Sequence, residues 1–255
     1  VWIIIGDNID ASIIDVIGKS VSTNSGIITF ENFEHIIGNV RDNTFYTARE
    51  EHKYDGAGGT DTVDYSALDA DIKSTISSLG VRIQADLANN IVKYDIKNQS
   101  YIDELASIEV IRGTSNDDIF KGAEGQSYTL FNGFGHIGRG DIVDFSDYSQ
   151  GVTISLNAQN GTDAQGGQYV LMNLEQVIGS ASGDTLEAHN SGSWLFGNAG
   201  NDTLNGHDGN DHIIGGAGAD ILDGGAGSDI YYYSKNEDAA LWHNIATDQI
   251  SDLSN

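Results

Sequence analysis

Four consecutive nine-residue units decide the fold of this chain: GNAGNDTLN (197–205), GHDGNDHII (206–214), GGAGADILD (215–223) and GGAGSDIYY (224–232). Each unit has glycine at its fourth position, aspartate at its sixth and an apolar or aromatic residue at its eighth. A flexible linker rich in Gly, Asn and Asp would have no reason to place an apolar residue every nine positions. The period therefore indicates stacked repeats, each contributing one small structural element.

The residue types suggest what each unit builds. Glycines supply the unusual backbone angles of a tight turn, and the residues after the aspartate suit a short strand with a single inward apolar side chain. One such strand cannot bury that side chain alone, so successive units must stack. If turns alternate between two sides, a full coil takes two units. Asp202 then lies beside the turn that carries Asp220, and Asp211 beside the turn that carries Asp229.

Stacked turns of this kind bring carboxylates and glycine-rich backbone carbonyls around a common gap. A gap lined by about six oxygens is the environment that Ca²⁺ prefers. We therefore predict several calcium ions, held in the regular units by Gly197, Gly200, Asp202, Gly206, Gly209, Asp211, Gly215, Gly218, Asp220, Gly224, Gly227 and Asp229.

The overall charge also calls for a cation. The chain has 255 residues with 38 acidic and 12 basic side chains, a formal net charge of -26. Such a chain repels itself, and phosphate binding would need clustered Lys and Arg, so nucleic acid is excluded as a main partner and anionic membranes are disfavoured. There is no Cys, so calcium would take the place of disulfides as the cross-link. No apolar run is long enough to span a membrane.

The units over 179–232 resemble the RTX calcium-binding repeats. The resemblance implies an all-β fold, a right-handed parallel β-roll or β-solenoid with calcium in each turn. It also implies a protein that a Gram-negative bacterium secretes through a type I system, so that it works outside the cell or at the cell surface.

Weaker copies of the unit occur upstream. GNVRDNTFY (38–46), GTSNDDIFK (113–121) and GSASGDTLE (179–187) each begin four residues after a glutamate, and their sixth residues are Asn43, Asp118 and Asp184. Asparagine offers an uncharged oxygen, so we expect the first of these sites to be weaker. Asp118 and Asp184 are predicted as further calcium ligands.

A second phrase also occurs twice, as GGTDTVDYS (58–66) and GRGDIVDFS (138–146). Asp61 and Asp141 in these phrases match the calcium phase and complete the predicted ligand set. Over roughly residues 54–232, with gaps, the pattern is similar to the C-terminal module of serralysin-type proteases.

We expect an irregular, degenerate solenoid over 1–178 with insertions at about 66–112, a regular roll over 179–233, and a capping segment over 234–255. The stretches 81–87 and 152–158 alternate apolar and polar residues and should be strands. Apolar residues at helical spacing predict one short helix over 66–80, and 98–108 should be a second short helix or a loop. We interpret the tyrosines at 231–233 as a capping patch, with a ligand-stacking surface as the alternative, and the chain as a monomeric piece of a longer protein.

Catalytic motifs are missing. The chain has no His-Glu-x-x-His zinc motif and no Gly-x-Ser-x-Gly elbow, and GFGHIG (133–138) lacks the strand and helix that a dinucleotide site needs. We therefore expect no enzyme. The favoured hypothesis is the ligand-binding region of a large RTX adhesin that recognises a surface protein, peptide or glycan. The alternative is the calcium-triggered folding and secretion module of an exoenzyme such as a protease, lipase or alginate epimerase. Ice binding would need a regular file of Thr, which is not present.

Overall fold

The computed structural model falls into two compact units, one of residues 1–120 and 130–138 and one of residues 121–129 and 139–255. It describes residues 2–5, 13–15, 20–23, 26–29, 34–47, 50–68, 81–96, 99–232 and 249–251. Among the described residues, no helix has the length and apolar character needed to cross a bilayer.

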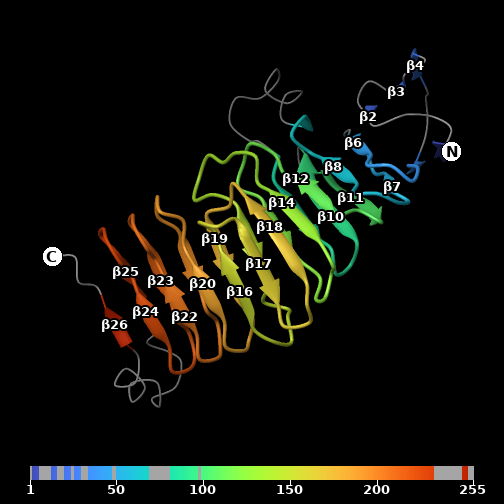
Figure 1. The fold of residues 1–255 in the computed structure, drawn as a ribbon. Coiled ribbons are helices and arrows are strands. Elements are labelled where there is room, and N and C mark those ends of the chain that lie inside the picture. The colour runs from blue at the N-terminus through green and yellow to red at the C-terminus, as the bar shows by residue number, and fades with distance from the viewer. Residues whose placement is uncertain are drawn as a thin grey trace. The chain divides into compact units, whose positions relative to one another are not determined.

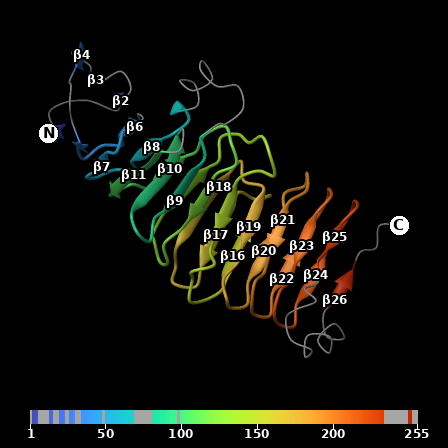
Figure 2. The same ribbon diagram turned by 180° about the vertical axis from the view of Figure 1, so that it is seen from behind.

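The second unit is built from two sheets of short strands. One sheet carries, in spatial order, β15 (Ile142–Asp144), β19 (Gln176–Ile178), β21 (Trp194–Phe196), β23 (His212–Ile214) and β25 (Ile230–Tyr231). The other carries β18 (Gln168–Met172), β17 (Asn160–Asp163), β16 (Val152–Ser155), β20 (Thr185–Glu187), β22 (Thr203–Asn205), β24 (Ile221–Asp223) and β26 (Gln249–Ser251). Figure 1 shows β20, β22 and β24 side by side, and Figure 2 shows β21, β23 and β25 from behind.

The register of these strands confirms the two-unit coil. Thr185 lies opposite Thr203 and Thr203 opposite Ile221, in parallel, so neighbouring strands of one sheet are 18 residues apart. The other sheet repeats the spacing, with Trp194 opposite His212. Because consecutive nines alternate between the sheets, the chain winds as the predicted parallel β-roll.

The core of the roll is a file of eighth-position side chains. The strands β20 to β24 have three residues each, and only the middle one points inward. These middle residues, Leu186, Leu195, Leu204, Ile213 and Leu222, are all buried, whereas Tyr231, the eighth residue of the last unit, is half-buried. One apolar side chain per nine residues makes a thin core, so the turns must contribute to stability as well.

Where the nine-residue phase is broken, the second unit inserts an antiparallel meander. Strands β16, β17 and β18 pair antiparallel, and β16 then joins the roll by pairing in parallel with β20. Phe145, Tyr148 and Tyr169 pack together beside this insertion, with the Tyr148 and Tyr169 hydroxyls 2.7 Å apart. The predicted strand at 152–158 is confirmed as β16.

The first unit repeats the plan with larger insertions. One of its sheets carries β1 (Trp2–Ile4), β5 (His35–Ile37), β7 (Lys53–Asp55), β11 (Gln99–Ala106), β10 (Ile91–Ile96) and β9 (Ile83–Asp86). The other carries β14 (Thr129–Asn132), β12 (Val110–Arg112), β8 (Thr62–Asp64), β6 (Thr44–Tyr46), β2 (Ile13–Asp15), β3 (Ser20–Thr23) and β4 (Gly26–Thr29). The last residue of β13 (Ile119–Lys121) and the first of β14 belong to the second unit.

The 18-residue coil is present here too, since His35 pairs with Lys53 and Thr44 with Thr62. The inward residues Ile36, Phe45, Tyr54 and Val63 are fully buried, and Phe45 and Tyr54 are larger than any inward residue of the regular roll. The degenerate copies upstream are therefore coils of the same kind, built around aromatic side chains.

One sequence prediction is wrong. Residues 99–106 form the strand β11, which pairs antiparallel with β10 and parallel with β7, in place of the expected helix or loop at 98–108. The burial alternates along its second half, because Asp103 and Leu105 point inward while Ile102 and Glu104 face solvent. That is the two-residue period of a half-buried strand.

Of the other predicted elements, one is confirmed and two lie largely outside the described residues. The predicted strand over 81–87 is confirmed as β9. Of the predicted helix over 66–80, the structure describes only the first three residues, including the buried Leu68, and 69–80 lie outside the described residues. Of the predicted cap over 234–255, only β26 is described.

Candidate metal sites in the turns

A ladder of hydrogen bonds links the sixth residues of successive coils. In each case one carboxylate oxygen of the aspartate accepts the backbone N–H of the sixth residue one coil earlier, 18 positions back. The bonds run from Asp184 to Asp202 (2.8 Å), from Ser193 to Asp211 (2.6 Å), from Asp202 to Asp220 (3.0 Å) and from Asp211 to Asp229 (2.9 Å). The predicted neighbours are therefore in direct contact through Oδ1.

The second carboxylate oxygen is left for another ligand. Among the described residues, Oδ2 is buried and has no hydrogen-bond partner at Asp202, Asp211 and Asp229. Burying an ionised carboxylate without compensation is strongly unfavourable. Burial, together with the charges of neighbouring aspartates, raises the pKa of Asp202 and of Asp211 to about 7. A divalent cation beside Oδ2 would remove this penalty.

Backbone carbonyl oxygens, which can also bind a metal ion, surround Oδ2 of these aspartates. A Cβ built on Gly206 would lie 2.5 Å from the carbonyl oxygen of Gly224, one coil on, and 2.7 Å from Asp211 Oδ2. A Cβ on Gly197 would collide in the same way with the Gly215 carbonyl and with Asp202 Oδ2. Carboxylate and carbonyl oxygens are hard donors, the set that suits Ca²⁺. The residues present therefore fit a calcium ion.

The second and fourth positions of each regular unit give the turn its shape. Both have left-handed backbone angles, with φ of 72° at Asn198, 63° at His207, 98° at Gly216 and 77° at Gly225 for the second position. At the fourth position glycine is required: Gly218 has φ 148°, and a Cβ there would overlap the carbonyl oxygen of Gly200. We call units with a left-handed second residue left-handed turns.

Comparison with protein families agrees with this geometry. Residues 178–213 and 196–231 match the RTX calcium-binding nonapeptide repeat, each match spanning a set of four copies. The chain carries RTX calcium-binding repeats. RTX repeats bind calcium, and RTX proteins are typically secreted by Gram-negative bacteria. Curated proteins gave no match to the chain.

Four of the described units have a different turn, and in two of them the sixth residue is an aspartate; in the other two the N–H of Asn39 donates to Asn43 and that of His189 to Ser193. The Asp184 carboxylate accepts the backbone N–H of Ser180 at 2.8 Å and its hydroxyl at 2.9 Å. Asp118 likewise accepts the N–H of Thr114 at 2.6 Å and its hydroxyl. We call these closed turns, because the second residue donates to the sixth side chain. Oδ1 of Asp118 and of Asp184 also accepts the N–H of a residue in an insertion, Ile83 and Val152 respectively, both at 2.8 Å. Both carboxylates therefore have hydrogen-bond donors already.

In the left-handed turns, the backbone N–H of the second residue does not donate to the aspartate of its own unit. The backbone N–H of His207 donates to Asn205 Oδ1 and that of Gly225 to Asp223 Oδ1, both at 3.0 Å. The acceptor in each case is the ninth residue of the preceding RTX unit. The second position thus decides whether the aspartate carboxylate is capped from within its own turn.

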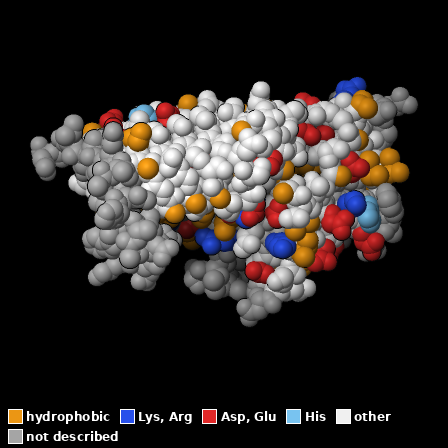
Figure 3. All heavy atoms as spheres, turned by 90° about the horizontal axis from the view of Figure 1, so that it is seen from below, with side chains coloured by type: hydrophobic (Ala, Val, Ile, Leu, Met, Phe, Trp, Pro, Cys, Tyr) orange, Lys and Arg blue, Asp and Glu red, His pale blue; other side chains and the backbone are white. Residues whose placement is uncertain are grey.

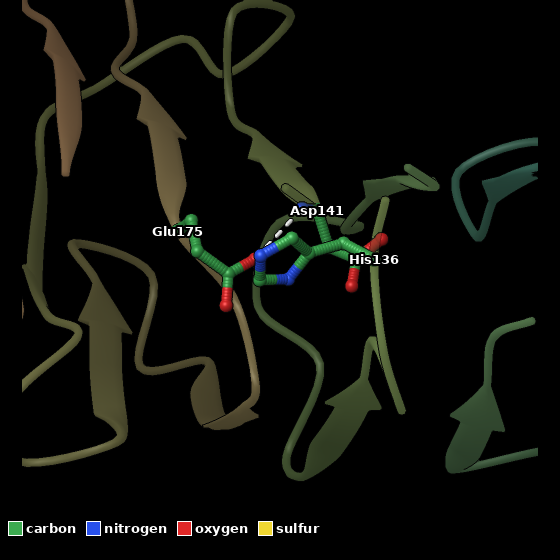
Figure 4. Close-up of side chains that lie close together, drawn as sticks. All are labelled: His136, Asp141 and Glu175. Carbon is green, nitrogen blue, oxygen red and sulfur yellow. Dashed lines mark hydrogen bonds between the residues drawn. The ribbon is translucent and has the colours of Figure 1, made fainter. Parts of the chain in front are cut away.

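Glutamates complete the ladder where insertions interrupt it. Glu109 Oε2 accepts the N–H of Asp61 at 2.9 Å, and Glu175 Oε2 accepts that of Asp141 at 2.9 Å (Figure 4). His136, also drawn in Figure 4, belongs to the first unit. Sequence reasoning used these glutamates as phase markers and missed their function. Their spacing could have revealed it. Each glutamate lies two residues before a buried apolar residue, Glu109 before Ile111 and Glu175 before Val177, as the sixth-position aspartate does in the regular units.

Asp103 is a further ladder member with both oxygens bonded. Its Oδ1 accepts the N–H of His52 and its Oδ2 the hydroxyl of Tyr65, both at 2.9 Å. Burial raises the pKa of Asp103 to about 7, and the charge of Glu51 adds to the shift. An unfolded aspartate has a pKa near ~3.9, so the folded state loses stability as pH rises from about 4 to about 7.

Asp103→Asn should therefore stabilise the first unit at high pH, because the amide keeps an acceptor for His52 without a buried charge. We expect its advantage over the natural chain to grow by about 1–2 kcal/mol between about pH 5 and about pH 8. Urea denaturation in calcium buffer at both pH values measures this. Glu104→Gln, at an exposed carboxylate, is the control. An advantage of Asp103→Asn that is equal at both pH values would contradict the assignment.

Proposed function

We propose that the chain is the calcium-dependent ligand-binding region of a large adhesin on the surface of a Gram-negative bacterium, and that it has no catalytic activity of its own. The calcium-binding RTX repeats would make the roll rigid outside the cell, where calcium is abundant. The ligand would be a surface protein, peptide or glycan. The observation that carries this proposal is a row of aromatic side chains on the outside of the roll.

The row follows one sheet across three coils. Trp194 and His212, which face each other on β21 and β23, stack with ring centroids 3.7 Å apart and planes within 1°. Tyr232 stacks next to His212 with ring centroids 5.6 Å apart, and its hydroxyl lies 2.7 Å from His212 Nδ1. The Arg139 guanidinium covers the Trp194 ring at 4.6 Å from its centroid. We call these four residues the aromatic row.

The roll itself does not need such side chains on its outer surface. At the same coils of the opposite sheet, the first outward position holds Thr185, Thr203 and Ile221. Much of the described surface in Figure 3 is likewise backbone and uncharged polar side chains. Trp, Tyr and Arg are the residues most enriched at the centres of binding interfaces. The asymmetry between the two sheets supports a binding role for the aromatic row.

A second candidate has its own support. The phrases at 58–66 and 138–146 form the same local structure: Asp64 and Asp144 each accept the N–H of the serine two residues on, at 2.9 and 2.8 Å. This repeated phrase belongs to the stretch, roughly residues 54–232 with gaps, that is similar to serralysin-type modules. It favours a calcium-triggered folding and type I secretion module attached to an exoenzyme.

Glycan and peptide arrays, probed with the full chain in calcium and in EDTA, test the first proposal. We expect calcium-dependent binding that Trp194→Ala and Tyr232→Ala reduce at least tenfold. Thr203→Ala on the opposite sheet is the matched control and should bind normally. Circular dichroism in calcium should be the same for all variants. If neither array gives a calcium-dependent hit, or if the aromatic variants bind as well as the control, the adhesin proposal fails and the secretion module is preferred.

A further inference from the structure

The turn at residues 56–61 has the geometry of the regular RTX turns, although it lies more than a hundred residues before the matched repeats. Its second residue, Ala57, has φ 68° and its fourth, Gly59, has φ 116°. Alanine in the left-handed region costs about 1 kcal/mol, so the surrounding structure must impose this conformation. The Ala57 N–H donates to Asp55 Oδ1 at 3.0 Å, as the N–H of His207 does to Asn205.

The sixth residue of this turn is a buried carboxylate with one oxygen bonded. The Asp61 side chain is fully buried, and its Oδ1 accepts the N–H of Asn43 at 2.6 Å. Its Oδ2 is buried and, within the part of the chain that the structure describes, has no hydrogen-bond partner. This is the arrangement found at Asp202 and Asp211.

The oxygen atoms around Asp61 Oδ2 also correspond to those around the aspartates of the regular repeats. A Cβ built on Gly56 would collide with Asp61 Oδ2 and with the carbonyl oxygen of Ser107. At Gly197 the corresponding atoms are Asp202 Oδ2 and the carbonyl oxygen of Gly215, one coil on. Ser107 thus takes the place of the next coil's glycine, and Glu109, bonded to the Asp61 N–H, takes the place of its aspartate.

No basic side chain makes an ion pair with Asp61 among the described residues. Acidic groups gather around the turn instead: Asp42 accepts the N–H of Thr60 at 2.7 Å, and Glu109 and Asp55 bond to the neighbouring backbone. A cation would stabilise a buried carboxylate among other carboxylates, and hard oxygen ligands favour a divalent one such as Ca²⁺.

We propose that residues 56–61, together with Ser107 and Glu109, form a calcium site in the first unit, whereas the closed turns at 113–118 and 179–184 bind no calcium. The rule that separates them is the second residue of each nine. A left-handed second residue leaves Oδ2 of the aspartate for the metal, and an ordinary one donates its N–H to the carboxylate. The inference does not depend on whether the chain binds a surface ligand.

Native mass spectrometry of the full chain in calcium counts the bound ions directly. We expect Asp61→Asn to bind one calcium ion fewer than the natural chain. Asp118→Asn, the same change in a closed turn, should bind the full number. Circular dichroism in calcium shows whether both variants are folded.

A second variant covers the case in which Asp61→Asn does not fold. Glu109→Gln keeps the acceptor for the Asp61 N–H but removes the charge, so one calcium ion should bind about tenfold more weakly in a calcium titration. The proposal is overturned if Glu109→Gln binds every ion as the natural chain does. It is also overturned if a folded Asp61→Asn variant keeps all its ions, or if Asp118→Asn loses one.

Discussion

Removal of calcium with EDTA should abolish most of the β-strand circular dichroism signal of this chain, and millimolar calcium should restore it. Folding stacks the carboxylates of successive coils one above another, as at Asp184, Asp202 and Asp220, on a chain whose net charge is already -26. The core offers only one apolar side chain per nine residues to offset this repulsion. Because the cations bind the folded turns and not the separated ones, binding free energy becomes folding free energy.

Two controls separate specific calcium binding from charge screening. Sodium chloride at high concentration weakens repulsion between exposed charges but supplies no ligand for a buried oxygen, so it should restore little strand signal. Magnesium should also be inferior, since it demands a smaller, octahedral set of ligands. Full recovery of the strand signal in sodium chloride alone would show that screening, and not metal coordination, stabilises the roll.

The second large effect concerns a single carboxylate. Asp220→Ala should raise the calcium concentration needed for half-maximal folding by about tenfold or more. Asp220 is 1% exposed and its Oδ1 accepts the N–H of Asp202, so alanine removes a predicted ligand and leaves a buried donor unsatisfied. Each of these losses is worth about 1–3 kcal/mol.

Asp208→Ala is the matched control, because Asp208 is exposed and lies at the third position of its unit. It removes the same charge from the same chain and should shift the calcium midpoint less than twofold. Calcium titrations followed by circular dichroism compare the two variants. Equal shifts would mean that the number of charges matters and their phase does not.

The regular coils could be predicted from the sequence because every local feature agrees with the same structure. The glycines, the aspartate and the apolar residue recur at one spacing, and this spacing fixes the 18-residue coil that pairs Thr203 with Ile221. Where the phase is lost, local patterns become ambiguous. Residues 98–108 were open to a short helix or a loop, but they contain the strand β11, in which Leu105 is buried and Ile102 faces solvent.

The division of the turns into two kinds could not be predicted. Asn198 and His207 are left-handed at the second position, whereas Ser180 and Thr114 donate to their own aspartates. The difference lies in a backbone angle and in one N–H, which donates to a side chain of the preceding strand in one kind of turn and to the turn's own aspartate in the other. For the same reason, Asp61 and Asp118 look equivalent in the sequence and differ in the structure.

A crystal structure of the chain grown in calcium, with anomalous difference density to locate the metal, tests the central claim most directly. We predict ions bound to Oδ2 in the turns of Asp202, Asp211, Asp220 and Asp229. Well-ordered turns in which these oxygens contact only water or protein would contradict the account.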